Sequence, residues 1–215
     1  MSLTEKPILF NTDMVRATLS GQKTVTRRVV NPKPPSNTHP NLFVTPPHQP
    51  GDILYVRETF FERKGKYYYK ADGKHLALND AIGGKEFFKW HPSIHMPRKA
   101  ARIFLRVKGI RMERLQSSFT EPICPILELQ AEGIDIGETC QECIENYGEP
   151  CCVDTVDEDG TDEPECGVLD EVRDDFARLW DSTIKPADLD QYGWAANPWV
   201  WVIEFERCEK PEVWP

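Results

Sequence analysis

The sequence has no long hydrophobic run: nothing in its 215 residues approaches the roughly 18 apolar residues that a membrane-spanning helix needs. A membrane protein is therefore excluded at this stage. The start of the chain, MSLTEKPILF, lacks the basic and apolar regions of a secretory signal, so we expect a cytoplasmic protein. With 40% hydrophobic and 28% charged residues, the composition is that of a globular chain, long enough for one elaborated domain or two very small ones.

Two nucleotide-binding devices are also missing. The sequence contains neither GxGxxG nor a Walker loop, which excludes a nucleotide cofactor held by either motif. The cysteine count is seven, and an odd number fits poorly with a closed disulfide framework. In a cytoplasmic protein these cysteines should be thiols or metal ligands.

The charge is divided unevenly along the chain, whose net charge is −9. Residues 1–120 hold 21 Lys and Arg against 9 Asp and Glu, whereas residues 121–215 hold 5 against 26. Much of the acidity lies in residues 135–167, which contain no Lys or Arg, and the rest of the chain is net positive. A basic part of this size attracts a nucleotide or a polyanion, and an acidic part repels one or masks the basic surface.

The order of expected elements predicts an α+β fold. Capping residues, β-branched runs, proline clusters and apolar spacing define each element. In chain order we expect a short helix after 11–13, a strand over 24–30, an extended loop over 31–50, a strand over 53–61, a hairpin turn at 64–66, a strand over 101–115, a helix over 121–132, a helix over 168–184 and a strand over 199–205. This order suits a small mixed barrel with flanking helices and does not suit a doubly wound sheet.

The segment GQKTVTRR at 21–28 carries the most information. It matches G-x-K-x-x-T-x-R at Gly21, Lys23, Thr26 and Arg28, and it resembles the signature of the ASCH superfamily. The resemblance extends through KPILFNTDMVRATLSG, GDILYVRETF, PSIHMPR, AEGI, FARLWDS and NPWVWVIEF. Together these segments are similar to the ASCH-domain proteins of bacteriophages and prophages.

The resemblance implies a PUA-like β-barrel, a fold associated with RNA binding and with recognition of modified bases. One branch of the family consists of amidohydrolases that remove acetyl from acetylcytidine with a Lys, a Thr and a Glu. Carried over, these catalytic roles fall on Lys23, Thr26 and Glu132. The same resemblance makes Gly21, Arg27 and Arg28 parts of a ligand-binding site, and it implies no cofactor there.

The residues themselves are compatible with that chemistry. A Thr hydroxyl becomes a nucleophile when a base removes its proton, and a Lys serves as the base if burial or nearby cations lower its pKa. A carboxylate such as Glu132 would orient the amine, and Arg28 would bind a phosphate or a base edge. The ordinary alternative is that Lys23 is a solvated lysine and Thr26 a strand threonine.

Four further residues are candidates for ligand binding. Arg57 and Glu58 end a predicted strand, where the alternative is an ion pair at the barrel end. His95 would bind a base edge or serve a structural role. Trp199 starts the last strand after Asn-Pro and would stack on a base, although its period-two stripe is also typical of core.

The acidic segment 135–167 holds five of the seven cysteines, and we interpret it as an insertion. Cys140, Cys143, Cys151 and Cys166 would supply the four thiolates of a structural zinc ion. Only the first pair has typical zinc spacing, so an ordered metal-free loop or redox pair and a solvated acidic loop remain alternatives.

Three functions follow as hypotheses. The first is a protein that binds a nucleoside, nucleotide or RNA and hydrolyses an amide on a modified cytidine. The second is a non-catalytic RNA or modified-base binding module. The third is a phage protein that binds a host factor through its acidic insertion.

Overall fold

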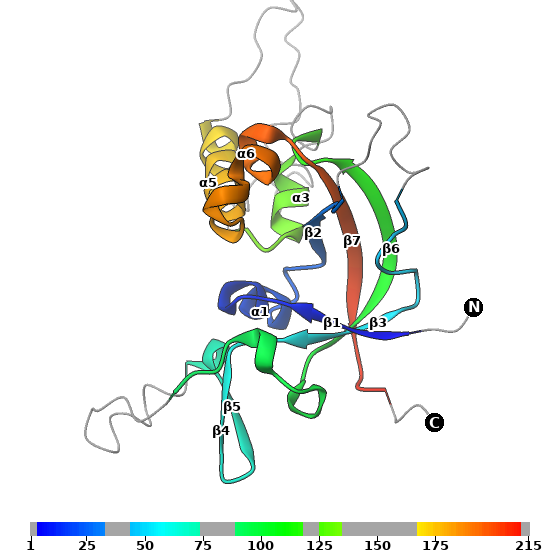
Figure 1. Cartoon of the computed structure of the whole chain (residues 1–215), viewed down its shortest axis with the longest axis vertical. Coiled ribbons are helices and arrows are strands. Elements are labelled where there is room, and N and C mark those ends of the chain that lie inside the picture. Colours follow the sequence, from blue (N-terminus) through cyan, green and yellow to red (C-terminus); the bar gives the residue numbers. More distant parts are fainter. Residues whose placement is uncertain (1–3, 33–43, 74–88, 118–124, 135–166, 212–215) are drawn as a thin grey trace, which may run out of the picture. The chain divides into compact units, whose positions relative to one another are not determined.

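The computed structural model describes residues 4–32, 44–73, 89–117, 125–134 and 167–211. These residues form two compact units, and β6 (Phe104–Arg114) and β7 (Trp199–Cys208) contribute to both. Unit 1 comprises residues 1–24, 47–110 and 204–215, and unit 2 comprises residues 25–46 and 111–203. The two units are described in turn below (Figure 1).

The described strands confirm a mixed α+β fold. Five of them form one sheet in the order β1-β3-β6-β7-β2. Strands β1 (Glu5–Leu9) and β3 (Ile53–Arg57) pair in parallel, whereas β3 and β6 pair antiparallel with Ile53 opposite Arg106. The sequence patterns predicted β3 and β6 but gave no warning of β1, whose EKPIL has too few β-branched residues to stand out.

In unit 1, β1 is followed by α1 (Thr12–Leu19), where the capping pattern predicts a helix. The Asn11 side chain accepts a hydrogen bond from the Met14 amide at 2.8 Å, which satisfies one of the free donors of the first turn. Gly21 then adopts φ +85°, a conformation that glycine reaches without steric cost. The helix and its glycine stop are therefore confirmed.

The segment after β3 forms a second strand rather than continuing the first. Strands β4 (Phe60–Arg63) and β5 (Lys66–Tyr69) make a separate two-stranded sheet, joined by the predicted turn. Short 3-10 helices follow among the described residues of this unit: η2 (Lys70–Asp72), η3 (Ser93–His95) and η4 (Arg98–Ala100).

The buried apolar side chains of unit 1 include one face of β6 and a cluster beside the hairpin. On β6, Leu105 and Val107 are buried while Arg106 and Lys108 are exposed, the alternation of a strand with one buried face. The cluster beside the hairpin consists of Ile53, Phe60, Met96, Ala100, Ala101 and Phe104.

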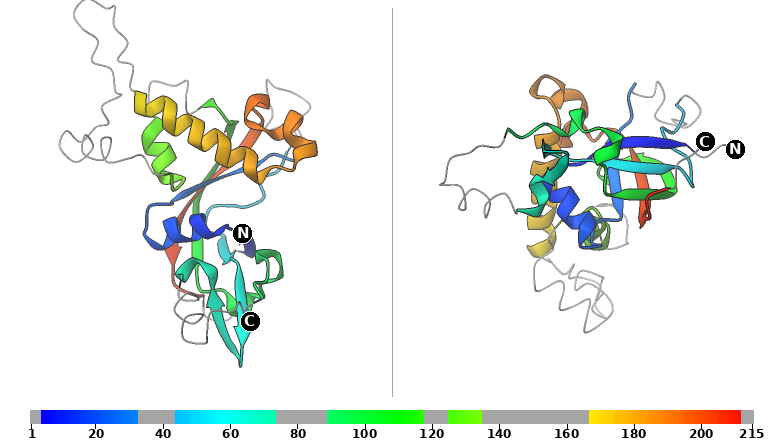
Figure 2. Two further views of the ribbon diagram at one scale, coloured as in Figure 1. Left: turned by 90° about the vertical axis from the view of Figure 1, so that its left-hand side faces the viewer. Right: turned by 90° about the horizontal axis from the view of Figure 1, so that it is seen from below.

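Unit 2 contains β2 (Val25–Val29) and the helices α3 (Pro125–Ala131), α5 (Gly167–Thr183) and α6 (Leu189–Tyr192), with η6 (Pro186–Asp188) and η7 (Trp194–Ala196). The views in Figure 2 show α3 beside α5. Their apolar faces share one core, which is made of Leu115, Leu129, Ile134, Val172, Phe176, Trp180, Val200 and Val202. The predicted amphipathic helix over 168–184 is thus confirmed as α5.

Candidate functional site

Lys23 lies in unit 1, just after the glycine that ends α1. Its amide donates to the Ala17 carbonyl at 2.9 Å, so the helix end fixes the main chain at this residue. Its side chain turns inward: the residue is only 2% exposed, and its ammonium lies 5.8 Å from the centre of the Phe10 ring. Lys23 is therefore not the solvated lysine that an isolated Lys-x-x-Thr would suggest.

Thr26 and Arg28 lie next to each other on β2, in unit 2. Both point to the same side of the strand because they are two residues apart, and the Arg28 guanidinium donates to Thr26 Oγ1 at 2.8 Å. A second hydrogen bond, to the Arg27 carbonyl at 2.9 Å, holds the guanidinium in place. Thr26 is fully buried. Burial lowers the pKa of Arg28, an effect that the charge of Glu132 opposes.

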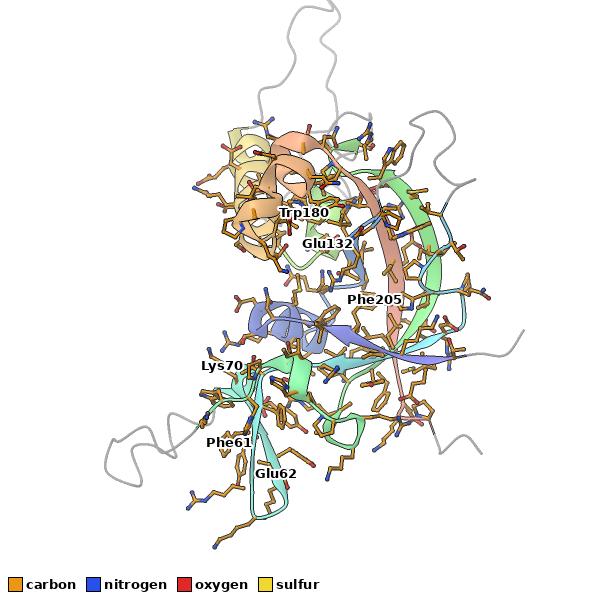
Figure 3. The ribbon with its side chains drawn as sticks, in the orientation of Figure 1. Phe61, Glu62, Lys70, Glu132, Trp180 and Phe205 are labelled. Atoms are coloured by element: carbon orange, nitrogen blue, oxygen red, sulfur yellow. The ribbon has the colours of Figure 1, made fainter. Side chains whose placement is uncertain are left out.

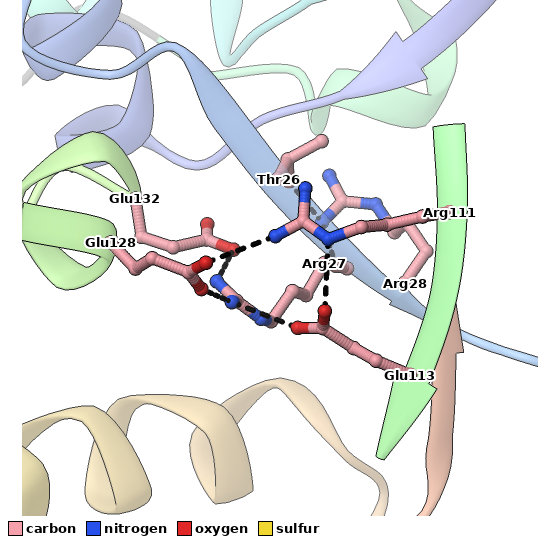
Figure 4. Close-up of polar contacts among 7 residues, drawn as sticks. All are labelled: Thr26, Arg27, Arg28, Arg111, Glu113, Glu128 and Glu132. Atoms are coloured by element: carbon pink, nitrogen blue, oxygen red, sulfur yellow. Dashed lines mark hydrogen bonds and ion pairs between the residues drawn. The ribbon is translucent and has the colours of Figure 1, made fainter. Parts of the chain in front are cut away.

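Arg27 points the other way and, itself buried, meets three carboxylates, of which Glu132 is buried and Glu113 and Glu128 are partly exposed (Figure 4). It donates to Glu132 at 2.9 Å and to Glu113 at 3.1 Å, and it also pairs with Glu128. Glu113 lies on β6, Glu128 on α3, and Glu132 just beyond α3. We call these four residues, together with Arg111, the Arg27 cluster.

The electrostatics of the Arg27 cluster favour a permanent cation at its centre. Burial by itself lowers the pKa of Arg27, but the charges of the three glutamates more than offset this and raise it. Arg111 supplies a second positive charge, donating to Glu113 at 3.0 Å and to Glu128 at 3.1 Å. Two cations thus stand against three carboxylates, and the buried pair of Arg27 and Glu132 couples β2 to the end of α3.

A second buried ion group lies in unit 1 around Glu58, at the end of the motif VRET. Glu58 is 1% exposed and accepts two hydrogen bonds from Arg102, at 2.8 and 2.9 Å. Arg102 also pairs with Asp72 at 2.7 Å and lies over the Tyr69 ring, 3.9 Å from its centre. Burial raises the pKa of Glu58 even though Arg102 opposes it.

Arg57 serves a different purpose from its neighbour Glu58. It donates to the main-chain carbonyls of Met96 and Ile94, so it supports the segment that contains η3. His95 lies on that 3-10 helix and is exposed. The alternative for these two residues is an ion pair with each other; in the structure Glu58 pairs with Arg102 instead.

Trp199 opens β7 in unit 2. Arg114 covers its ring at 4.7 Å from the centre and also donates to the Asn197 carbonyl at 2.8 Å. Asn197 adopts φ +43°, which turns the chain into the strand. A small hollow beside this stack is lined by Val30, Arg114, Gln191, Tyr192, Ala196, Pro198 and Trp199.

The structure brings some predicted residues into contact within one unit, and others belong to the other unit. Thr26 and Arg28 are in contact, as are Arg27 and Glu132, and all four belong to unit 2. Lys23 and Glu58 belong to unit 1.

The main partners of these residues were missed by the sequence analysis. Arg102, Asp72, Glu113 and Glu128 stand in no motif. The available signal was charge inside otherwise apolar segments, as in ARIFLRVK for Arg102.

The predicted zinc ligands Cys140, Cys143, Cys151 and Cys166 lie outside the described residues, as does segment 135–166 of the predicted insertion. Within the described ranges, no group of three or more His, Cys, Asp or Glu side chains is arranged to hold a metal ion. Cys208, on β7, is a half-buried thiol whose pKa is raised by burial. Across the same ranges, no helix combines the length and the apolar character required to cross a bilayer.

Comparisons with known proteins give little further information. No family model matches the sequence. No curated protein matches it significantly. Among solved structures, one described as the crystal structure of hypothetical protein PH0355 aligns over 96% of this chain and 100% of that chain, with 12% identity and a TM-score of 0.32. Neither fold nor function is inferred from a likeness of this size.

Proposed function

We propose that this chain is an ASCH-type protein, with its sheet as part of a PUA-like barrel, and that it binds a nucleoside, a nucleotide or an RNA element. The observation that carries the proposal is burial of the polar residues in the two resembling motifs. Lys23 and Thr26 of G-x-K-x-x-T-x-R and Glu58 of VRET are all among the most buried polar residues described.

This burial needs an explanation because it is costly. Lysine and glutamate are almost never fully buried in proteins unless they are paired, since their charged groups lose hydration. Groups of buried ionisable residues recur at functional sites, where their environment is set for binding or catalysis. The burial of Lys23 therefore favours a site over the ordinary alternative of a solvated lysine. The burial of Glu58 is offset in part by its pairing with Arg102, so Glu58 gives weaker support.

The ligand class follows from charge and from Arg28. Outside the acidic segment the chain is net positive, which attracts phosphates. Arg28 is held by Thr26 and by the Arg27 carbonyl, so less side-chain entropy is lost when it binds a planar acceptor. Guanidinium groups bind phosphates and base edges in this way.

Binding is tested by calorimetric titration of the full chain with cytidine and with N4-acetylcytidine. Lys23→Met keeps the apolar stem and removes the ammonium, so it should fold normally and lose binding by at least about tenfold, the effect of about 1.4 kcal/mol. The control is Lys185→Met, at an exposed lysine, which should bind as the wild type does. Unchanged binding in Lys23→Met, or no binding by the wild type, would count against the proposal.

A second candidate function is hydrolysis of the amide of an acetylated cytidine, and one contact favours it. The hydrogen bond from Arg28 to Thr26 Oγ1 would stabilise negative charge on that oxygen. In this reaction Thr26 Oγ attacks the acetyl carbon, its hydroxyl proton passes through a base to the departing amine, and cytidine leaves. The resemblance gives the role of this base to Lys23. Water then hydrolyses the acetyl-threonine ester and releases acetate. Glu132 would act through Arg27, whose guanidinium it binds.

Deacetylation is followed by chromatography of N4-acetylcytidine incubated with each variant. Thr26→Val removes the hydroxyl at nearly constant volume and should abolish turnover, whereas Thr26→Ser keeps the hydroxyl and should retain it. Thr45→Val changes an exposed threonine and is the matched control. Absence of turnover in the wild type, or equal turnover in Thr26→Val, would reject the hydrolytic function and leave the binding proposal in place.

A further inference from the structure

The hairpin formed by β4 and β5 stands apart from the main sheet of its unit. The two strands pair with each other, from Phe60 opposite Tyr69 to Arg63 opposite Lys66, and Figures 1 and 3 show the ribbon extending away from β3. At its base, residue 91 pairs with residue 60 through two main-chain hydrogen bonds of 2.7 and 3.2 Å. The segment at 89–91 therefore runs along the hairpin.

Exposed cations gather on this part of unit 1. We call the hairpin surface the exposed residues of the ribbon together with the exposed lysines that follow or flank it. Its cations are Arg63, Lys64, Lys66, Lys70, Lys89 and Lys99. Against them stand two exposed acids among the described residues of this surface, Glu62 on the ribbon and Asp72, which follows it and pairs with Arg102. The Tyr67 side chain raises the pKa of Lys99.

Two features of the turn are unfavourable for folding and so indicate another role. Arg63 and Lys66 lie directly opposite each other, and like charges in that arrangement destabilise a β-ribbon. Lys64 adopts φ +50°, where asparagine or glycine fits better. A bound polyanion would offset the repulsion.

The aromatic side chains of the hairpin pack against one another and so stabilise the ribbon, rather than forming an exposed apolar surface. Phe61 stacks on Tyr68 with ring centres 4.7 Å apart, and Trp90 meets Phe61 edge-on at 5.2 Å. Phe60 and Phe61 are both buried. Since the tip at 62–66 carries charged residues and a glycine, it offers no apolar side chain for insertion into a lipid membrane.

We propose that the hairpin surface binds the phosphate backbone of RNA, as a second contact surface separate from the residues of the two motifs. The choice of RNA rests on the proposed function, and the choice of the phosphate backbone rests on the cations. Phosphate contacts of this kind position a nucleic acid without reading its sequence. Their contribution to affinity depends on salt because each neutralised phosphate releases counterions.

The test compares two triple variants of the full chain. Arg63→Gln, Lys64→Asn and Lys66→Gln together remove the charges at the hairpin tip and place asparagine at the positive φ. The control, Arg178→Gln, Lys185→Gln and Lys210→Gln, removes the same charge from exposed residues elsewhere.

The measurement is fluorescence anisotropy of a labelled oligouridylate of about 20 nucleotides over a range of salt concentrations. For the hairpin variant, the slope of log affinity against log salt should become less steep by about 2, and the affinity at about 0.1 M salt should fall about 100-fold. Its thermal stability should equal or exceed that of the wild type, because the repulsion at the turn is relieved. The control variant should keep the wild-type slope.

Several results would overturn the inference. These are an unchanged slope in the hairpin variant, equal loss in both variants, tighter binding of the matching DNA strand, and binding of anionic phosphatidylserine vesicles in place of RNA. Titration with N4-acetylcytidine separates this inference from the proposed function, since a nucleoside has no phosphate. If Lys23→Met loses nucleoside binding and the hairpin variant does not, the result supports the motif site. If the hairpin variant loses the salt dependence of RNA binding and Lys23→Met does not, the result supports the hairpin surface.

Discussion

Replacing Arg27 by methionine should destabilise the protein more than replacing any exposed arginine. The Arg27 side chain is 3% exposed and pairs with three glutamates, among them Glu132, which is itself 6% exposed. Methionine fills the space of the arginine stem but leaves the buried carboxylate without its cation. Removing one partner of a buried ion pair costs about 3 to 5 kcal/mol.

The size of this effect is large enough to measure by two methods. For a chain of this length, 1 kcal/mol corresponds to about 2 to 4 °C in Tm, so Arg27→Met should lower the Tm by about 6 to 20 °C. Urea unfolding followed by tryptophan fluorescence gives the free energy directly, since Trp180 and Trp201 are both buried.

Two further variants decide whether the buried pair is the cause. Arg178→Met is the control, because its side chain is 75% exposed and pairs only with a half-exposed Asp175 among the contacts described. Such a pair contributes about 0 to 1 kcal/mol. Arg27→Met with Glu132→Gln should recover at least about 1 kcal/mol relative to the sum of the single variants, because neutral glutamine no longer needs the cation. Equal stability of Arg27→Met and Arg178→Met would refute the reasoning.

Three other predictions concern unit 1. Arg102→Met should cost about 3 to 5 kcal/mol because Glu58 stays buried, while Arg106→Met, at an exposed arginine, should cost less than about 1 kcal/mol. Burial raises the pKa of Glu58 above its ordinary 4.5, and protonation of the carboxylate removes the cost of burying its charge. The stability lost in Arg102→Met should therefore shrink as the pH falls and grow as the pH rises through the folded-state pKa of Glu58. A loss of stability that does not change with pH contradicts this. The pKa of Asp52 is instead held below its ordinary 3.8, since hydrogen bonds from two main-chain amides at 3.0 Å outweigh the effect of burial. The stability that the ionised Asp52 contributes is present above that value and is lost as the pH falls through the folded-state pKa. Asp52→Asn should therefore make stability depend less on pH in acid unfolding monitored by circular dichroism. Gly21→Ala should lower the free energy of unfolding in urea by about 1 to 2 kcal/mol because alanine is strained at φ +85°. An added Cβ meets no heavy atom within 4 Å, so the backbone conformation is the sole cause. Unchanged stability of Gly21→Ala would show that the loop adopts another conformation at no cost.

Local signals predicted most elements of the fold. Asn11 and Gly21 bounded α1 in the sequence because capping and positive φ depend on single residues. Strand β1 escaped prediction because its strand character comes from pairing with β3, and pairing over nearly fifty residues leaves no local pattern. The strand expected over 53–61 divides into β3 and β4 for the same reason: β4 is defined by its partner β5.

The site was predictable in its motif and not in its partners. The spacing of Lys23, Thr26 and Arg28 is visible in the sequence, but the residues that hold this region together come from β6 and α3. Glu113 and Glu128 lie 86 and 101 residues from Arg27, and only the fold makes them neighbours. Glu58 illustrates the same limit of sequence analysis: its adjacent cation, Arg57, supports a loop, while the distant Arg102 binds its carboxylate.

The central claim is that the buried polar residues of the motif form a nucleoside-binding site, and calorimetric titration with N4-acetylcytidine tests it most directly. The account predicts saturable binding by the wild type and by Lys185→Met, and loss of that binding in a folded Lys23→Met. Equal heats of binding in Lys23→Met and the wild type would contradict it, as would a wild-type protein that binds neither cytidine nor its acetylated form.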